Sequence, residues 1–178
     1  WRIPVRAPEM VNLRRGPTLW TALEEQGVPA TMFRIPANFP PTPTNQKTLA
    51  GLGVPDIHGG YGVFTFYTDK IGEVTRDVSG GRIERISLKN GLARCVLRGP
   101  VNTLRAGAAQ VEVPFEVAAD AQARAARIVF QDRTLVLREG EWSDWVVVDF
   151  ALLPISHVRG IFRFYLKECG TDFQLYAT

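Results

Sequence analysis

Residues 111–117 read Val111-Glu112-Val113-Pro114-Phe115-Glu116-Val117, and every second residue of this stretch is apolar. A period of two is typical of a β-strand that turns one face to a core and the other to water. Proline has no N–H to donate to a neighbouring strand, so Pro114 favours an edge position for this strand.

The same period continues on both sides of this stretch. Ala93, Cys95 and Leu97 alternate with arginines, and strand patterns recur at 63–68, 82–88, 126–130, 134–138, 145–152, 161–167 and 173–177. Glycine-containing turns separate these patterns, and Asn90-Gly91 is the strongest hairpin signal among them. Residues 62–178 are therefore predicted to form an antiparallel β-sandwich or an open barrel.

The N-terminal part has a different pattern. Residues 18–27 read TLWTALEEQG and predict a short amphipathic helix, with Thr18 as its N-cap and Gly27 at its end. An apolar strand at about 30–35 follows, which makes an αβ unit. Residues 39–62 hold too many prolines and glycines for a regular element, and loops of this length in compact domains are usually functional or disordered.

Together these patterns predict an α+β chain that is mainly β. We expect residues 1–61 to be a partial segment of a larger α/β core with a Pro/Gly-rich connecting loop. Residues 62–178 are expected to be a β-rich domain attached to it.

The composition is that of an ordinary folded protein. The chain has 178 residues, of which 46% are hydrophobic and 22% charged, and its formal net charge is +3. Arginines are interleaved with acids, which argues against nucleic-acid binding. No apolar run approaches the roughly 20 residues of a membrane span. The first residue is Trp1, so we expect a piece of a longer protein.

Few residues suggest chemistry. The usual phosphate-loop, dinucleotide, zinc-protease and serine-hydrolase motifs are absent from the sequence, and Cys95 and Cys169 favour two buried free thiols. Asp56 and His58 supply two metal ligands at most, so no metal site is predicted. Trp142 and Trp145 favour core positions, with a stacking platform for a sugar as the alternative.

Longer motifs carry a resemblance. Residues 19–41 read LWTALEEQGVPATMFRIPANFPP, residues 49–69 read LAGLGVPDIHGGYGVFTFYTD, and GEWSDWVVVDF, GIFRFYLKE and FQLYAT lie near the C-terminus. This wording resembles the middle of the predicted phosphohydrolase or phosphomutase branch of the alkaline phosphatase superfamily, the type I phosphodiesterase and nucleotide pyrophosphatase-like proteins. Between about residues 69 and 139 the likeness is only a general β pattern.

The resemblance implies a parent enzyme that uses two divalent metals, zinc or manganese, and a Thr or Ser nucleophile on a small phosphate ester. It places the nucleophile and the metal ligands outside this chain, so no catalytic residue and no cofactor are expected within it. The expected partner is the remaining α/β catalytic core, and the isolated chain is expected to be inactive.

The resemblance also suggests one wall of the active-site cleft. Arg34, Asn38, Asp56 and His58 are its candidate substrate-binding residues. Two alternatives remain open from the residues alone, an independent carbohydrate-binding β-sandwich and an oligomerisation module. Unpaired edges of the strand near 30–35 favour artificial self-association of the isolated chain.

Overall fold

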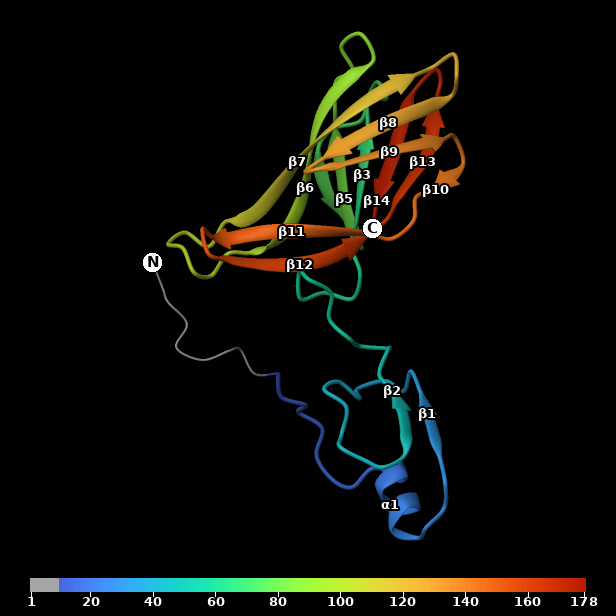
Figure 1. Ribbon diagram of the computed structural model, residues 1–178, viewed down its shortest axis with the longest axis vertical. Coiled ribbons are helices and arrows are strands. Elements are labelled where there is room, and N and C mark those ends of the chain that lie inside the picture. Colours follow the sequence, from blue (N-terminus) through green and yellow to red (C-terminus); the bar gives the residue numbers. More distant parts are fainter. Residues whose placement is uncertain (1–9) are drawn as a thin grey trace. The chain divides into compact units, whose positions relative to one another are not determined.

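The computed structural model describes residues 10–178, which divide into two compact units, 10–56 and Ile57–Thr178. Both units are drawn in Figure 1. The predicted boundary lies five residues later, after Tyr61. In the described part of the chain no helix is long and apolar enough to cross a membrane.

The 10–56 unit contains a short helix, α1 (Leu19–Glu25), and two strands, β1 (Thr31–Phe33) and β2 (Lys47–Leu49). The Thr18 hydroxyl accepts a hydrogen bond from the Thr21 N–H at 3.1 Å, which confirms the predicted N-cap. Gly27 has a φ of 68°, in the left-handed region where glycine carries no steric penalty. The helix is two residues shorter than predicted at its C-terminal end.

β1 and β2 pair in parallel, with Phe33 opposite Leu49. β2 lies inside the segment 39–62 that the sequence predicts to be irregular. Its three residues are too few for a periodic pattern. Hydrogen bonds from side chains hold this segment, since Glu24 accepts from the Asn45 N–H at 2.9 Å and the Gln46 side chain accepts from the Ala30 N–H at 2.8 Å.

The Ile57–Thr178 unit is built almost entirely of strands, which confirms a mainly-β fold. A six-stranded sheet has the order β10 (Glu141–Trp142), β13 (Phe164–Cys169), β14 (Phe173–Ala177), β3 (Phe64–Thr68), β5 (Gly81–Arg85) and β4 (Arg76–Val78). A four-stranded sheet has the order β6 (Leu92–Val101), β7 (Gln110–Asp120), β8 (Ala125–Phe130) and β9 (Arg133–Arg138). The third sheet is the hairpin of β11 (Val146–Leu153) and β12 (Ser156–Phe162).

One apolar core joins the three sheets. The Phe115 ring of β7 lies edge-on to Tyr67 of β3, with 5.2 Å between ring centroids, and 5.3 Å from Phe164 of β13. Phe130 of β8 contacts Phe162 of β12 at 5.5 Å. Such aromatic contacts stabilise by about 0.5–1.5 kcal/mol each beyond the area that they bury. The choice between a sandwich and an open barrel stays a prediction.

The predicted edge position of the strand around Pro114 is wrong, because β7 lies between β6 and β8. The Ala119 N–H donates to the Gly91 carbonyl at 2.7 Å, so these two residues form a hydrogen-bonded pair at the end of the β6–β7 ladder. Hydrogen-bonded and non-hydrogen-bonded pairs alternate along an antiparallel ladder. Pro114, opposite Val96, therefore falls in a non-hydrogen-bonded pair. The missing N–H of Pro114 therefore faces the β8 side. Pairing with β8 begins only at Phe115, so no hydrogen bond between β7 and β8 is lost at Pro114.

One further prediction needs correction. The pattern at 161–167 predicts one strand, but the chain leaves β12 at Phe162 and enters β13 at Phe164, in a different sheet. Within residues 57–178, pairing is mostly antiparallel, as predicted, and β3 with β5 is the one parallel pair. β4 follows β3 in sequence but pairs on the far side of β5, so β5 fills the place between them.

The Asn90-Gly91 turn forms as predicted in its backbone, with φ values of 53° and 76°. Lys89 and Leu92 close the turn with reciprocal hydrogen bonds of 2.8 and 3.0 Å. The flanking strands do not continue as a hairpin, because β5 belongs to the six-stranded sheet and β6 to the four-stranded sheet. The turn is therefore where the chain changes sheets.

The β11–β12 hairpin runs at an angle to the strands of the other two sheets (Figure 1). Phe150 of β11 is 2% exposed, and its ring lies between Gly99 of β6 and Gly160 of β12. A Cβ at Gly99 would collide with this ring. Absence of a side chain at Gly99 is therefore what lets the hairpin approach β6.

Candidate functional site

Of the predicted substrate-binding residues, Arg34 and Asn38 follow β1. The Arg34 side chain is exposed and packs against Gly51. The Arg34 backbone has a φ of 53°, and its N–H donates to the Leu49 carbonyl at 2.8 Å. Asn38 is only 1% exposed, and its amide contacts Thr48 Oγ1 at 3.3 Å and the Thr42 N–H at 3.4 Å. Asn38 therefore holds the loop that follows β1.

Asp56 and His58 fall in different units. Asp56 is the half-buried last residue of the 10–56 unit, and His58 is exposed near the start of the other unit. The His58 Nδ1 lies 3.4 Å from the side-chain nitrogen of Gln110 in β7. A substrate-binding role for these four residues stays a prediction.

A hollow of about 530 Å³ lies in the 10–56 unit between residues 10–21 and residues 40–43. Arg14 is the titratable side chain of its lining, and this guanidinium also lies 4.8 Å from the centre of the Trp20 ring. Neither Arg34 nor Asn38 lines the hollow. Within residues 10–178, no three side chains of His, Cys, Asp or Glu are grouped so that they could hold a metal ion.

Trp142 and Trp145 do not lie in the core, so that expectation is wrong. Their exposed fractions are 45% and 62%. Trp142 belongs to the edge strand β10, and Trp145 precedes β11 rather than lying within it. The buried residues of this region are Ser143 and Val146 instead. Exposure keeps the carbohydrate alternative open as a prediction.

The two tryptophans lie at one end of an aromatic row on the six-stranded sheet. Cross-strand register aligns Trp142, Tyr165, Tyr176 and Phe66 on the face opposite the core. Trp142 stacks on Tyr165 with 4.8 Å between ring centroids and 28° between ring planes. Phe66 and Tyr176 lie 4.5 Å apart at 31°. We call this surface the outer aromatic face.

Two cations contact the rings of this face. The guanidinium carbon of Arg163 lies 4.9 Å from the centre of the Trp142 ring and 5.4 Å from that of Trp145. The Lys167 ammonium lies 5.7 Å from the Phe66 ring. The sequence pattern does not predict the outer aromatic face. It indicates one strand at 161–167, whereas Arg163 lies between β12 and β13. The alternation Arg163-Phe164-Tyr165-Leu166-Lys167 nevertheless carries the signal, since Arg163, Tyr165 and Lys167 alternate with the buried Phe164 and Leu166.

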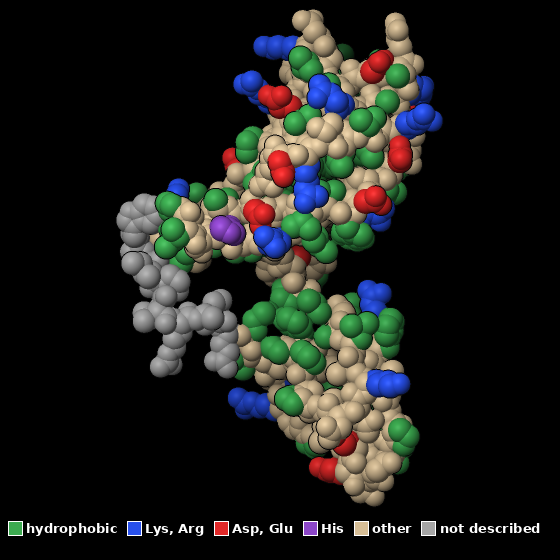
Figure 2. All heavy atoms as spheres, in the orientation of Figure 1, with side chains coloured by type: hydrophobic (Ala, Val, Ile, Leu, Met, Phe, Trp, Pro, Cys, Tyr) green, Lys and Arg blue, Asp and Glu red, His purple; other side chains and the backbone are tan. Residues whose placement is uncertain are grey.

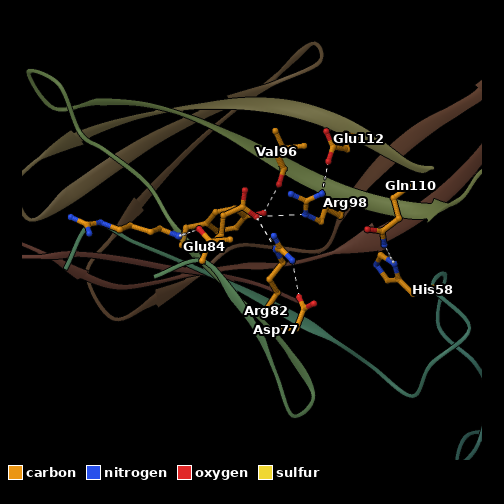
Figure 3. A network of polar contacts seen from close by, with 11 residues as sticks. His58, Asp77, Arg82, Glu84, Val96, Arg98, Gln110 and Glu112 are labelled. Atoms are coloured by element: carbon orange, nitrogen blue, oxygen red, sulfur yellow. Dashed lines mark hydrogen bonds and ion pairs between the residues drawn. The ribbon is translucent and has the colours of Figure 1, made fainter. Parts of the chain in front are cut away.

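A cluster of charged side chains, shown in Figure 3, joins the six-stranded sheet to the four-stranded sheet. The Glu84 carboxylate of β5 lies 3.7 Å from Arg82 Nε and 3.6 Å from Arg98 Nε of β6. Arg82 also pairs with Asp77 at 2.7 Å, and Arg98 with Glu112. Glu84 keeps 17% of its side chain exposed. Each of these five charged side chains has an opposite charge within 4 Å, but the contacts of Glu84 Oε2 are too long to be hydrogen bonds.

Two buried groups next to this cluster hold their protons. Burial, and then the negative charge of Glu84, raises the pKa of the Cys95 thiol to about 12 and raises that of the Tyr67 hydroxyl as well. The Tyr67 hydroxyl donates to the Val96 carbonyl at 2.8 Å. Both cysteines are free and buried, as predicted. A thiol with a raised pKa is a poor nucleophile at neutral pH.

Lys, Arg, Asp and Glu side chains are interspersed on the drawn face of the Ile57–Thr178 unit (Figure 2). Comparisons with protein-family models, with curated proteins and with solved structures find no match for this chain.

Proposed function

We propose that this chain is a non-catalytic region of a metal-dependent phosphohydrolase of the phosphodiesterase and nucleotide pyrophosphatase-like type, and that it covers or shapes the active-site cleft. The long motifs at 19–41 and 49–69 support the class of enzyme. In this proposal the two metals and the nucleophile belong to another part of the enzyme, as the resemblance implies.

One observation of the 10–56 unit carries the proposal. Its sheet has only two strands, which are parallel, and Phe33 and Leu49 form a directly opposed pair with exposed fractions of 67% and 54%. Parallel strands are found almost only in larger sheets that are covered on both faces. Leu19 of α1 is 73% exposed as well. Such a unit is expected to extend and pack against a larger α/β core.

The test compares this chain with the product of its whole open reading frame. We expect the 178-residue chain to give no turnover of bis(p-nitrophenyl) phosphate with zinc or manganese. The whole product is expected to hydrolyse it, with loss of activity in EDTA and recovery on adding metal. Saturable turnover by the chain alone, or none by the metal-loaded whole product, would contradict the proposal.

The candidate substrate contacts are tested in that whole product. If Arg34 and Asp56 touch the substrate, Arg34→Ala and Asp56→Ala each lower kcat/KM at least about tenfold without changing the melting temperature. Arg15→Ala is the matched control, because Arg15 is an exposed arginine of the same unit. Unchanged kcat/KM in both variants would make these residues scaffold only.

A further inference from the structure

The outer aromatic face carries an arginine that is held in place before any ligand binds. Arg163 Nε donates to the Ser143 carbonyl at 3.0 Å, and its guanidinium lies over the rings of Trp142 and Trp145. Within residues 10–178, no side chain or carbonyl pairs with its two terminal nitrogens. A fixed guanidinium loses little conformational entropy on binding, and its terminal N–H groups fit a carboxylate.

The rings beside Arg163 are better suited to aliphatic side chains than to flat ligands. Trp142 stacks on Tyr165, and Phe66 packs against Tyr176, so each of these rings has one face covered by its neighbour. Tyr165 and Tyr176 have centroids 6.5 Å apart, and a base or sugar inserted between two rings needs about 7 Å. What these paired rings still offer is one uncovered face each and their edges, which are partly positive.

The charge of the face favours an acidic partner. Lys167 lies on β13 four residues after Arg163, which puts the two backbone positions about 13 Å apart. The Lys167 stem crosses β14 to reach the Phe66 ring, because β14 lies between β13 and β3. Cross-strand register places two further cations, Arg76 of β4 and Arg85 of β5, on the same face. Glu168 of β13 is the one carboxylate at a strand position of this face. Arg76 is paired with the Glu73 carboxylate, and Arg85 donates to the Glu73 carbonyl at 3.4 Å.

We propose that the outer aromatic face binds an acidic amphipathic helix of a partner protein. A helix satisfies its own backbone hydrogen bonds, so it can lie on a sheet face that has no ladder to offer. Glutamates at i and i+7 lie about 10.5 Å apart on one side of a helix, and their flexible side chains can span the roughly 13 Å between the backbone positions of Arg163 and Lys167. Leucines at i+3 and i+4 then lie on the ring edges between the two cations.

The probe is an 18-residue alanine-based helical peptide with glutamates at i and i+7 and leucines at i+3 and i+4, labelled for fluorescence anisotropy with the 178-residue chain. We expect saturable binding that weakens at least tenfold in Arg163→Leu and several-fold in Trp145→Ala. Arg163→Lys keeps the charge but loses the planar fork, so it should bind at least threefold more weakly than the unchanged chain.

Arg127→Leu is the matched control, because Arg127 is an exposed arginine of β8 in the other large sheet. It should change binding less than twofold, and a peptide with lysines in place of the glutamates should not bind. Melting temperatures confirm that the variants fold. Absence of saturable binding, or equal weakening by Arg163→Leu and Arg127→Leu, would overturn the proposal. So would tighter binding of oligogalacturonate or oligo-dT that depends on Arg163.

Discussion

At the scale of single residues, Glu84 is a shared ion-pair partner of two arginines. Its carboxylate lies between the guanidinium groups of Arg82 and Arg98, which keep 30% and 26% of their side chains exposed. Glu84→Gln removes the negative charge between two partly buried guanidinium groups, which then keep only their other partners, Asp77 and Glu112. We expect the free energy of unfolding to fall by about 1–3 kcal/mol, less than for a fully buried triad because water still reaches the groups.

Urea unfolding measures this loss, with Glu116→Gln as the control. Glu116 pairs with Arg94 at 3.2 Å, but the two side chains are 63% and 90% exposed. Such a pair contributes little, so the control should change stability by less than about 0.5 kcal/mol. Equal effects of the two substitutions would mean that the Glu84 cluster is as screened as the surface pair.

Cys95 gives the stability a definite dependence on alkaline pH. Its pKa is about 12 in the folded chain, whereas a thiol of an unfolded chain titrates near about 8.5. Between these values the folded state keeps a proton that the unfolded state has released. The stabilisation is therefore complete below about pH 8.5, and it declines by about 1.4 kcal/mol per pH unit as the pH rises toward 12.

The measurement is urea unfolding at pH 9, 10 and 11 for the unchanged chain and for Cys95→Ala. The alanine variant is expected to be less stable at every pH because of the cavity, but to lose less stability per pH unit. Tyr67 has a raised pKa of the same sign, so part of the slope should remain. Identical slopes in the two proteins would show that Cys95 does not control the effect.

At the scale of elements, the β11–β12 hairpin depends on one glycine. Gly99→Ala places a methyl group in the space of the Phe150 ring, so the hairpin or β6 must shift. We expect a loss of about 1–3 kcal/mol in the free energy of unfolding, the usual cost of overpacking a core. Gly170→Ala is the control, since only the Arg124 side chain lies within 4 Å of the place that its new methyl group would take. Differential scanning calorimetry of both variants should show a lowered melting temperature for the first alone.

Periodicity predicts which segments become strands more reliably than it predicts their neighbours. The pattern around Val113 and Phe115 gives strand β7, and Thr18 and Gly27 mark both ends of α1. The position of β7 inside its sheet does not follow from Pro114, because it depends on where β8 ends. Strands of two or three residues, such as β10 and β4, are shorter than the window in which a period can be recognised.

The sequence pattern favours core positions for Trp142 and Trp145 over the exposed positions that they occupy. Apolar side chains are usually buried, but a tryptophan that stacks on Tyr165 and contacts Arg163 gains enough from these partners to remain half exposed. Tyr165 lies in β13 and Arg163 directly before it, so the whole β11–β12 hairpin separates both partners from Trp142 along the chain. Contacts at that separation leave no trace in a local pattern.

At the scale of the whole molecule, the two units are expected to differ in stability. The Ile57–Thr178 unit contains the three-sheet core, whereas the 10–56 unit buries few apolar side chains, chiefly Trp20 and Met32. A chain of residues 57–178 should unfold in one cooperative transition within a few degrees of the melting temperature of the 178-residue chain. Near-ultraviolet circular dichroism and calorimetry test this, and loss of cooperative unfolding on removal of 1–56 would contradict it.

The six-stranded sheet ends on both sides in very short strands, β10 with two residues and β4 with three. A second sheet that approached either side would find only a few backbone groups to pair with. Growth of ordered fibrils requires long, flat, unpaired borders on which further chains can be added. The brevity of these two strands therefore protects a chain rich in β-structure from becoming a template for amyloid along this sheet.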